Sequence, residues 1–239
     1  MLRTEVRASN FFINEVNSLR SARASLTLAA IWSTCEDKML DYPAMSFFQF
    51  FDNHRLMHKE RPKWRTVTGG SENYVRTVAD ALGDRVRLNS GVERIFPFGD
   101  HIAVVTTDGR REIFDDVILA THSDQALRLT EEHFDDQAFL LRSVRYRPNR
   151  IYLHRDPALM PSRKAAWASW NVLKQESGDI CLTYWMNRLQ GLPDERPLFI
   201  TLNPDTPPRD ELTFLEYDFD HPQFDAAAEA AVRSLKRIQ

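Results

Sequence analysis

The sequence predicts a mixed α/β fold, in part α+β, in which a three-stranded antiparallel meander interrupts a mainly parallel, buried sheet. We expect a second, antiparallel sheet to follow it. Three observations lead to this prediction. A helical pattern at residues 72–82 lies between two short apolar segments, and alternating runs at residues 92–114 surround an Asp-Gly pair. Four runs rich in aromatic and β-branched residues between 147 and 202 are separated by glycines, prolines and charged turns.

The stretch from Thr66 to Leu88 predicts a strand, a helix and a second strand. Gly69 and Gly70 allow a tight turn, and Ser71 can cap the helix that follows. Gly83 lies just after the predicted helix, at the position where a glycine in the left-handed conformation commonly ends a helix. The apolar face of this helix consists of Tyr74, Val75, Val78, Ala79 and Leu82.

The meander is predicted from residues 92–96, 102–107 and 110–114, with Asp108-Gly109 as the hairpin turn. The next run, Val117 to Ala120, is apolar at every position, which is typical of a strand covered on both faces. Ser123 then begins another helix. We therefore expect the chain to return to the parallel sheet at residues 117–120.

The composition is that of an ordinary globular protein, with 43% apolar and 27% charged residues and a net charge of -3. This charge gives no sign of attraction to nucleic acid or to a membrane surface. The apolar run LTLAAIW is too short to cross a bilayer, and the first residues lack a signal-peptide pattern. Cys35 and Cys181 have no C-x-x-C spacing, so we expect a reducing, cytoplasmic location.

Pro43 opens a helix with phenylalanines at 47, 48, 50 and 51, which place apolar groups around most of its circumference. The functional alternative is a wall of an apolar channel or of a flavin site, and the plain alternative is a buried core helix. His54 and His58 lie one helical turn apart, but no acidic third ligand has a recognisable position. No metal site is expected.

Residues 43–191 resemble the middle of flavin-dependent amine-oxidase-type oxidoreductases, in particular a bacterial group of NAD/FAD-binding proteins, and five strings carry the resemblance. They are FFDNH, WRTVTGGS, VILATHSDQAL, AAWASWN and TYWMNRLQGLP. The resemblance implies an FAD-dependent oxidoreductase with a partial Rossmann-like FAD-binding domain and an antiparallel substrate domain. Residues 64–145 would be the FAD-domain remnant, 146–221 the substrate sheet, 1–63 a helical segment of the substrate domain, and 222–239 a helix returning to the FAD domain.

Three residues are candidates for contact with FAD. The resemblance implies that Val92, at the strand entering the meander, lies along the adenosine. Thr121 and His122 follow the carboxyl end of residues 117–120, where open α/β sheets place their ligands. The alternatives are a core role for Val92 and a polar loop role for His122.

The pyrophosphate-binding G-x-G-x-x-G turn of the family is absent, because the eight glycines lie at 69, 70, 83, 91, 99, 109, 178 and 191. The Gly-rich segment that touches the flavin ring in this family has no counterpart either. Two backbone hydrogen bonds contribute about 1 kcal/mol each, whereas micromolar affinity requires roughly 8 kcal/mol. We therefore expect an interior fragment of a flavoenzyme that does not retain FAD.

Candidate substrate residues lie in the aromatic strands: Trp167, Trp170, Tyr184, Trp185 and the amide of Asn187. The resemblance implies that this sheet faces the flavin, while the plain alternative is core packing. Alternation places Trp167 and Trp170 on opposite faces.

The sequence is also compatible with a flavin-free binding module. In it, the aromatic sheet and the phenylalanine helix enclose an apolar small molecule without flavin. Apolar surface left uncovered predicts a homo-oligomer.

Overall fold

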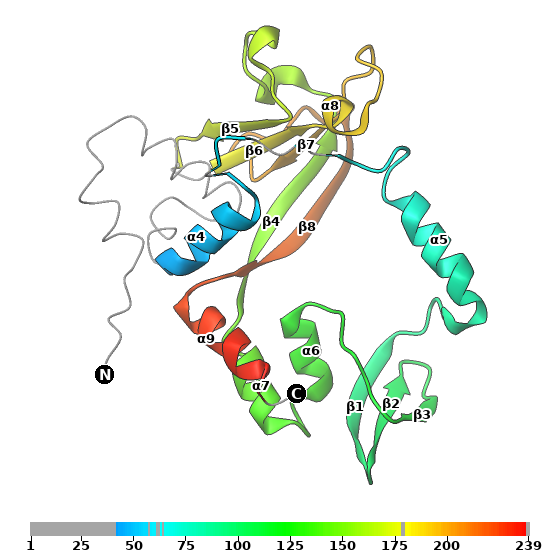
Figure 1. Ribbon diagram of the computed structural model, residues 1–239. Helices are drawn as coiled ribbons and strands as arrows, with labels where there is room; N and C mark the ends of the chain where they lie inside the picture. The colour runs from blue at the N-terminus through cyan, green and yellow to red at the C-terminus, as the bar shows by residue number, and fades with distance from the viewer. Residues whose placement is uncertain (1–41, 57, 61–62, 64, 178–179, 238–239) are drawn as a thin grey trace, which may run out of the picture. The chain divides into compact units, whose positions relative to one another are not determined.

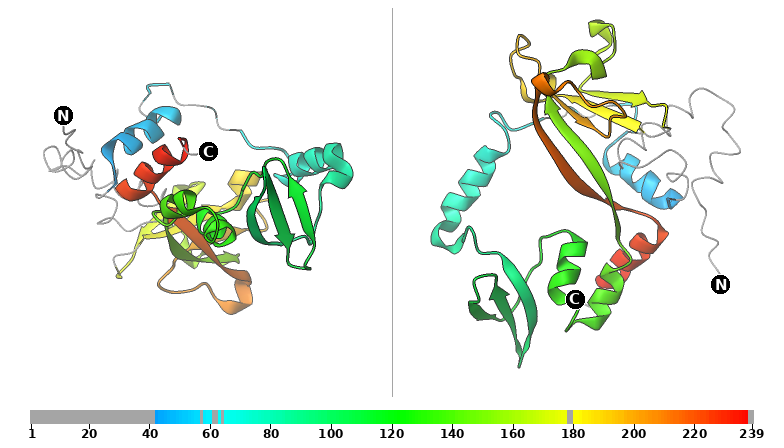
Figure 2. Two further views of the ribbon diagram at one scale, coloured as in Figure 1. Left: turned by 90° about the horizontal axis from the view of Figure 1, so that it is seen from below. Right: turned by 180° about the vertical axis from the view of Figure 1, so that it is seen from behind.

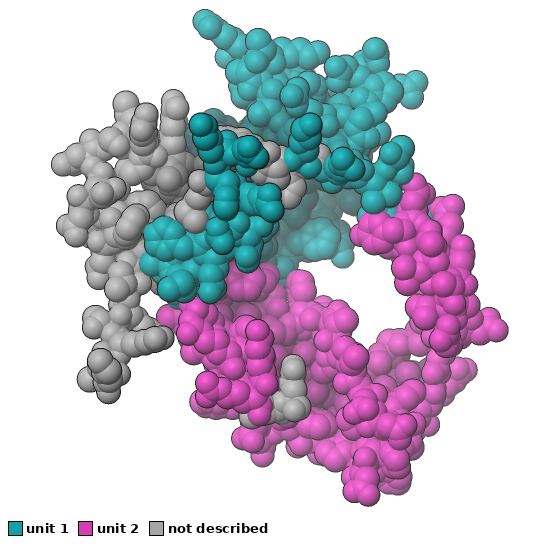
Figure 3. Space-filling view, viewed as in Figure 1, with its two compact units in different colours: residues 1–72, 147–221 teal, residues 73–146, 222–239 magenta. Residues whose placement is uncertain are grey.

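The computed structural model describes residues 42–237 except 57, 61–62, 64 and 178–179 (Figure 1). The chain forms two compact units, coloured separately in Figure 3. Unit 1 contains residues 1–72 and 147–221, and unit 2 contains residues 73–146 and 222–239. Each unit is thus assembled from two stretches that are distant in sequence. The fold is mixed α/β with two antiparallel sheets, as the sequence predicts at the level of class.

The predicted meander forms the sheet of unit 2. Its strands are β1 (Val92–Phe98), β2 (His101–Thr106) and β3 (Arg111–Phe114), in the order β1-β2-β3. Gly109 has φ 83°, the left-handed conformation that the predicted Asp-Gly turn requires. Ile95, Ala103 and Val105 are buried, and each lies in β1 or β2. The alternation of the sequence therefore sets both the register and the buried face of this sheet.

Three helices complete the core of unit 2: α6 (Ser123–Thr130), α7 (Asp135–Leu141) and α9 (Ala226–Leu235). Helix α6 packs against β1 and α7, and α7 packs against α9, which lies beside it in Figures 1 and 2. Their buried residues are small, mainly alanines at 126, 138, 228 and 231. Asp225 accepts a hydrogen bond from the Ala228 amide at 3.0 Å, which caps α9 three residues after the predicted start at Pro222.

The predicted strands that flank the meander do not form. Helix α5 (Glu72–Leu82) ends at Gly83, which has φ 56° as expected, but a single 3-10 turn follows at Gly83–Arg85. Residues 86–88 and 117–120 have no strand partner among the described residues, and Ile118 is 92% exposed. A parallel strand is stable when neighbours pair with it and helices cover both of its faces. Without those neighbours, an apolar run alone does not make a strand.

Unit 1 contains a five-stranded antiparallel sheet in the order β5-β6-β7-β4-β8. Its strands are β4 (Arg145–His154), β5 (Trp170–Lys174), β6 (Ile180–Trp185), β7 (Phe199–Leu202) and β8 (Thr213–Gln223). The first four match the predicted runs, while β8 was not predicted as a strand. The predicted helix rich in phenylalanine is α4 (Ala44–Asn53). No helix in the described part of the chain is both long and apolar enough to cross a membrane.

Strand β8 has no fully buried residue, so its stability comes from pairing with β4 rather than from burial (Figures 1 and 2). Arg150 of β4 binds two carboxylates of β8, with 2.5 Å from Nε to Oε1 of Glu216 and 2.6 Å from Nη1 to Oδ2 of Asp218. Hydrogen bonding with Tyr152 in the first place, and then with these two carboxylates, raises the pKa of Arg150. The charged residues Glu216 and Asp218 are therefore cross-strand partners that tie this edge strand to β4.

Hydrogen exchange measured by mass spectrometry tests the unpaired state of residues 117–120. We expect their amides to exchange like those of an unstructured peptide, because the described residues offer them no partner, while Ala103 and Val105 stay protected. Strong protection at residues 117–120 would contradict the structure.

Matched charge substitutions provide the control. Ile118→Asp should change the free energy of unfolding by less than about 0.5 kcal/mol, as surface substitutions do. Val105→Asp should cost several times more, because it buries an unpaired charge.

Candidate functional site

The start of helix α6 in unit 2 is the first candidate region, because Thr121 and His122 precede it. The Tyr146 hydroxyl accepts a hydrogen bond from the Ser123 amide at 2.8 Å and lies 2.9 Å from Ser123 Oγ. The His122 ring stacks on the Tyr146 ring, with 5.1 Å between centroids. Tyr146 thus satisfies the Ser123 amide at the start of the helix.

Asp124 gives this helix start an acidic character. Its Oδ1 atom is buried without a hydrogen-bond partner among the described residues, and it lies 4.0 Å from His122 Nδ1. Its Oδ2 atom lies 3.5 Å from Arg128 Nη1. A carboxylate in the first turn opposes the binding of a phosphate at the same helix end. Ligand groups that donate a hydrogen bond, such as hydroxyl or N–H groups, suit this position better than a pyrophosphate does.

Val92 begins β1, pairs with Thr106 and is exposed. The register shifts between Val92 and Arg94, so this end of the strand is irregular. Helix α6 packs against β1, which places the element that follows His122 beside the element that begins at Val92. The Thr121 hydroxyl donates to its neighbour, the His122 carbonyl, at 3.1 Å. The three candidate cofactor residues therefore belong to adjoining elements of one unit.

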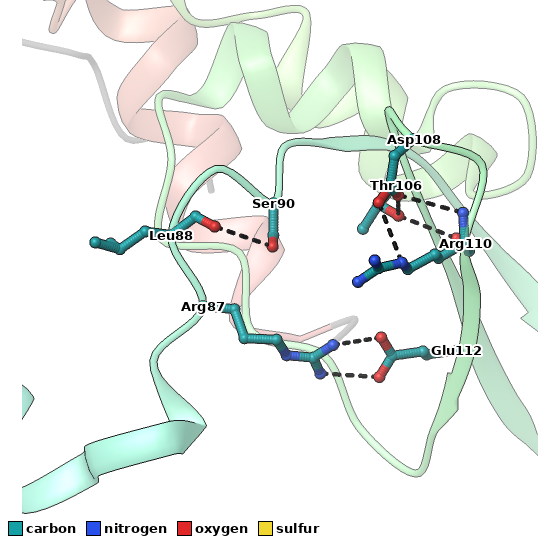
Figure 4. A network of polar contacts seen from close by, with 7 residues as sticks. All are labelled: Arg87, Leu88, Ser90, Thr106, Asp108, Arg110 and Glu112. Carbon is teal, nitrogen blue, oxygen red and sulfur yellow. Dashed lines mark hydrogen bonds and ion pairs between the residues drawn. The ribbon is translucent and has the colours of Figure 1, made fainter.

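An ion pair holds the segment before β1 in place of the predicted strand pairing (Figure 4). Arg87 binds both oxygens of Glu112 in β3, with 2.8 Å between Nη2 and Oε2. The pair lowers the pKa of Glu112 and raises that of Arg87, in both cases first through the hydrogen bond. Both groups are exposed, so the pair positions residues 86–90 without adding much stability.

Two of the candidate substrate residues, Trp167 and Trp185, lie in the core of unit 1. Their rings meet edge to face at 5.3 Å and pack with Met160 and Phe199. The indole nitrogen of Trp167 donates to the Pro161 carbonyl at 2.8 Å. Core packing accounts for both side chains, which is the plain alternative that the sequence left open.

Trp170 and Tyr184 form a second aromatic pair, on the opposite face of the sheet. They are cross-strand partners in β5 and β6, and their rings meet at 5.3 Å. Trp170 is 45% exposed and lines a cavity of about 510 Å³ together with Met160, Pro161 and Val172. Burial raises the pKa of the Tyr184 phenol. Trp170 is thus a candidate substrate residue that borders a cavity.

Asn187 is 2% exposed and holds a loop rather than facing a cavity. Its Nδ2 atom donates to the carbonyls of Pro193 and Arg196 at 2.6 and 2.8 Å, and its Oδ1 accepts from the Leu198 amide at 2.7 Å. It lies in α8 (Met186–Gln190), which ends at Gly191 with φ 64°. The side chain thus sets the path of residues 191–198.

A buried polar chain crosses the centre of the same sheet and was missed from the sequence. His154 Nε2 lies 2.7 Å from Thr201 Oγ1, which lies 2.8 Å from Thr183 Oγ1. The Asp156 amide donates to His154 Nδ1 at 3.1 Å, so Nε2 carries the hydrogen of the neutral ring. Threonines inside the apolar runs of β6 and β7 were the signal for this network.

Burial opposes protonation of His154, whereas the nearby Asp156 carboxylate favours it. The ring is 0% exposed, and burial lowers its pKa to about 4. Arg209 donates to Asp156 at 3.0 Å and lowers the pKa of that buried carboxyl to about 2. Asp156 is therefore an anion paired with Arg209.

The histidines considered for a metal site have other partners. His54 Nδ1 contacts the Phe50 carbonyl at 2.8 Å, and His58 Nε2 contacts Asp52 Oδ1 at 3.1 Å. Within the described ranges, no three His, Cys, Asp or Glu side chains are grouped so that they could hold a metal ion.

Comparison with known proteins gives the class of this chain. The family described as flavin containing amine oxidoreductase matches residues 10–182. The chain belongs to this family. No curated protein matches the sequence.

Solved structures show the same fold at low sequence identity. A fatty acid isomerase from P. acnes is similar with a TM-score of 0.65 and 12% identity, over 98% of this chain and 59% of that one. Cyclohexylamine oxidase from Brevibacterium oxydans gives 0.60 and 12%, over 90% and 53%. Putrescine oxidase gives 0.56 and 15%, over 83% and 44%. The chain thus spans about half the length of these neighbours.

Denaturant unfolding at a series of pH values tests the neutral state of His154. Its pKa is lower in the folded protein than the usual 6.5, so the unfolded chain binds the proton more tightly. Stability should therefore fall between pH 6.5 and about 4, by up to about 3 kcal/mol. The loss of stability that accompanies protonation of Asp156 occurs at lower pH.

The pH profile of His154→Gln separates this effect from a general acid response. The variant should be less stable at neutral pH, but its free energy of unfolding should fall less between pH 6.5 and 4. His133→Gln, at an exposed ring, should keep the slope of the natural protein. Equal slopes in all three proteins would refute the assignment.

Proposed function

We propose that this chain is part of an FAD-dependent oxidoreductase of amine-oxidase type that acts on a small molecule. The match of the flavin containing amine oxidoreductase family over residues 10–182 carries this proposal. The flavin ring supplies the redox chemistry when it is bound, so the protein contributes binding, orientation and exclusion of water. A reaction of this kind needs no Ser-His-Asp triad or metal centre.

The described residues fit the adenosine side of FAD better than its phosphates. Backbone groups of β1 near Val92 can bind adenosine, and Thr121 and His122 offer polar groups at the adjoining helix start. Asp124 in the first turn of α6 disfavours a phosphate there. Because the sequence also lacks G-x-G-x-x-G, we propose that this polypeptide does not retain FAD unaided.

The substrate would approach the Trp170 and Tyr184 face of the sheet in unit 1. Two of the structural neighbours are named as oxidases of putrescine and of cyclohexylamine, and a third as a fatty acid isomerase. Their names have in common small substrates with an alkyl or cycloalkyl part. The cavity beside Trp170 has apolar walls that suit such a group.

A flavin-free binding module is the second candidate, supported by a specific observation. Residues 86–88 and 117–120, which the flavin fold would use as parallel strands, are not strands in the described structure. The cavity beside Trp170, in contrast, is formed by residues 158–173 of unit 1. Such a module would bind an apolar molecule there without redox chemistry.

The absorbance of freshly purified protein in the flavin band tests whether this polypeptide retains FAD. We expect little flavin, and added FAD should bind more weakly than micromolar, because few of the contacts that hold the pyrophosphate are present. Stoichiometric yellow protein would overturn the proposal that FAD is not retained.

Reduction of the flavin tests the oxidoreductase class itself. If FAD at high concentration binds, an amine substrate should bleach the flavin band in the absence of oxygen. Binding of apolar amines without any FAD binding would favour the flavin-free module. His122→Ala should weaken FAD binding several-fold, while His101→Ala, an exposed histidine of the meander, should not.

We further propose that the protein self-associates in a reducing, cytoplasmic environment. The side chains of one face of α5 are exposed: Tyr74, Val75, Val78 and Leu82. Apolar patches of this kind tend to be covered in water. Cys181 is a buried free thiol whose pKa is raised to about 11, in keeping with a reduced state.

Light scattering over a range of protein concentrations tests the association. We expect the apparent mass to rise with concentration, and Val78→Lys to lower it by placing a charge in the apolar face. Asp80→Lys, which adds a lysine to the opposite face of α5, is the matched control. A monomer at every concentration would contradict the proposal.

A further inference from the structure

A second surface cavity in unit 1, of about 450 Å³, combines apolar walls with cationic groups. Its apolar lining consists of Leu192, Pro193, Pro197, Leu198 and Phe214. Its charged lining consists of Arg155, Glu195 and Arg196. It shares no lining residue with the cavity beside Trp170. We call it the arginine pocket.

The two arginines of the arginine pocket are not neutralised by the protein. Among the described residues, neither Arg155 nor Arg196 forms an ion pair, and Glu195 forms none either. The acidic neighbours Asp156 and Glu211 are engaged by Arg209, at 3.0 Å from Nε and 3.9 Å from Nη1. The lining therefore carries a net charge of about +1, from two guanidinium groups and one carboxylate.

Arg155 is held in position from two sides. Its amide donates to the Leu212 carbonyl at 2.9 Å, and it directly follows His154, whose ring is fixed in the buried polar chain. Its guanidinium lies over the Phe214 ring at 5.9 Å from the centroid. This cation–π contact orients the charge while leaving its hydrogen-bond donors free for a ligand.

Asn187 fixes the other wall of the arginine pocket. Its three side-chain hydrogen bonds, of 2.6 to 2.8 Å, reach the backbone of residues 193, 196 and 198. Six of the lining residues lie in this 192–198 loop. Because both donors and the oxygen of this side chain bond to the loop, the wall is largely formed before a ligand arrives.

We propose that the arginine pocket binds an organic monoanion that carries one carboxylate on an apolar alkyl or aryl body. A guanidinium pairs with a carboxylate through two parallel hydrogen bonds. Glu195 disfavours ions with several negative charges, such as phosphate. The apolar walls and the volume suit a small ligand body. All of its lining residues lie in unit 1 and none of them is a candidate flavin contact, so carboxylate binding there does not require bound flavin.

Calorimetric titration of the full chain with octanoate and phenylacetate tests the proposal, and octylamine and inorganic phosphate serve as comparison ligands. We expect both carboxylates to bind more tightly than octylamine and phosphate do. Arg155→Gln and Arg196→Gln should each weaken carboxylate binding about 10-fold, since each removes a charge-assisted pair. Arg163→Gln removes an exposed arginine of the same unit outside the pocket and should leave the affinity unchanged.

Asn187→Ala provides a second test that keeps both arginines. It should weaken carboxylate binding by freeing the loop, with circular dichroism showing that the protein stays folded. If this variant unfolds, the two arginine variants still decide the matter. Equal binding of octylamine, tighter binding of phosphate, or unchanged affinity in Arg155→Gln and Arg196→Gln would overturn the proposal.

Discussion

The buried hydrogen-bond chain from His154 through Thr201 to Thr183 is the interaction on which unit 1 depends. It joins the three central strands β4, β7 and β6 through their side chains, in addition to the backbone ladder. Each of these three side chains has a hydrogen-bond partner, as a polar group that is buried away from water requires. The Asp156 amide makes His154 Nδ1 an acceptor, so Nε2 carries the hydrogen of the neutral ring. A neutral histidine is thereby part of the fold.

Both cavities of unit 1 have lining residues that adjoin this hydrogen-bond chain. The Leu159 carbonyl, which accepts from Thr183, belongs to the lining of the cavity beside Trp170. Arg155, which follows His154, belongs to the arginine pocket. A rigid polar core thus positions an apolar cavity in one place and a cationic one in another. Sites supported by such a core keep their geometry better than sites on free loops.

Unit 2 shows the opposite situation, in which local structure forms without its expected surroundings. The meander has its own buried residues and hydrogen-bond ladder, and helix α5 has its predicted limits. Residues 117–120 lack a strand partner among the described residues, and the apolar face of α5 is exposed. These are the parts that a doubly covered parallel sheet would use. The family membership and the unformed strands are therefore compatible, because this chain spans about half of its structural neighbours.

The sequence by itself determined the elements whose signals are local: the Asp108-Gly109 hairpin, the limits of α5 at Gly83, four strands of the larger sheet, and the family. Tertiary structure alone decided the pairing of β8 with β4 and the loop-anchoring role of Asn187. It also decided that Trp170 borders a cavity while Trp167 lies in the core. The physical reason is that turns and periodicity depend on neighbours in sequence, whereas burial and strand pairing depend on partners far along the chain.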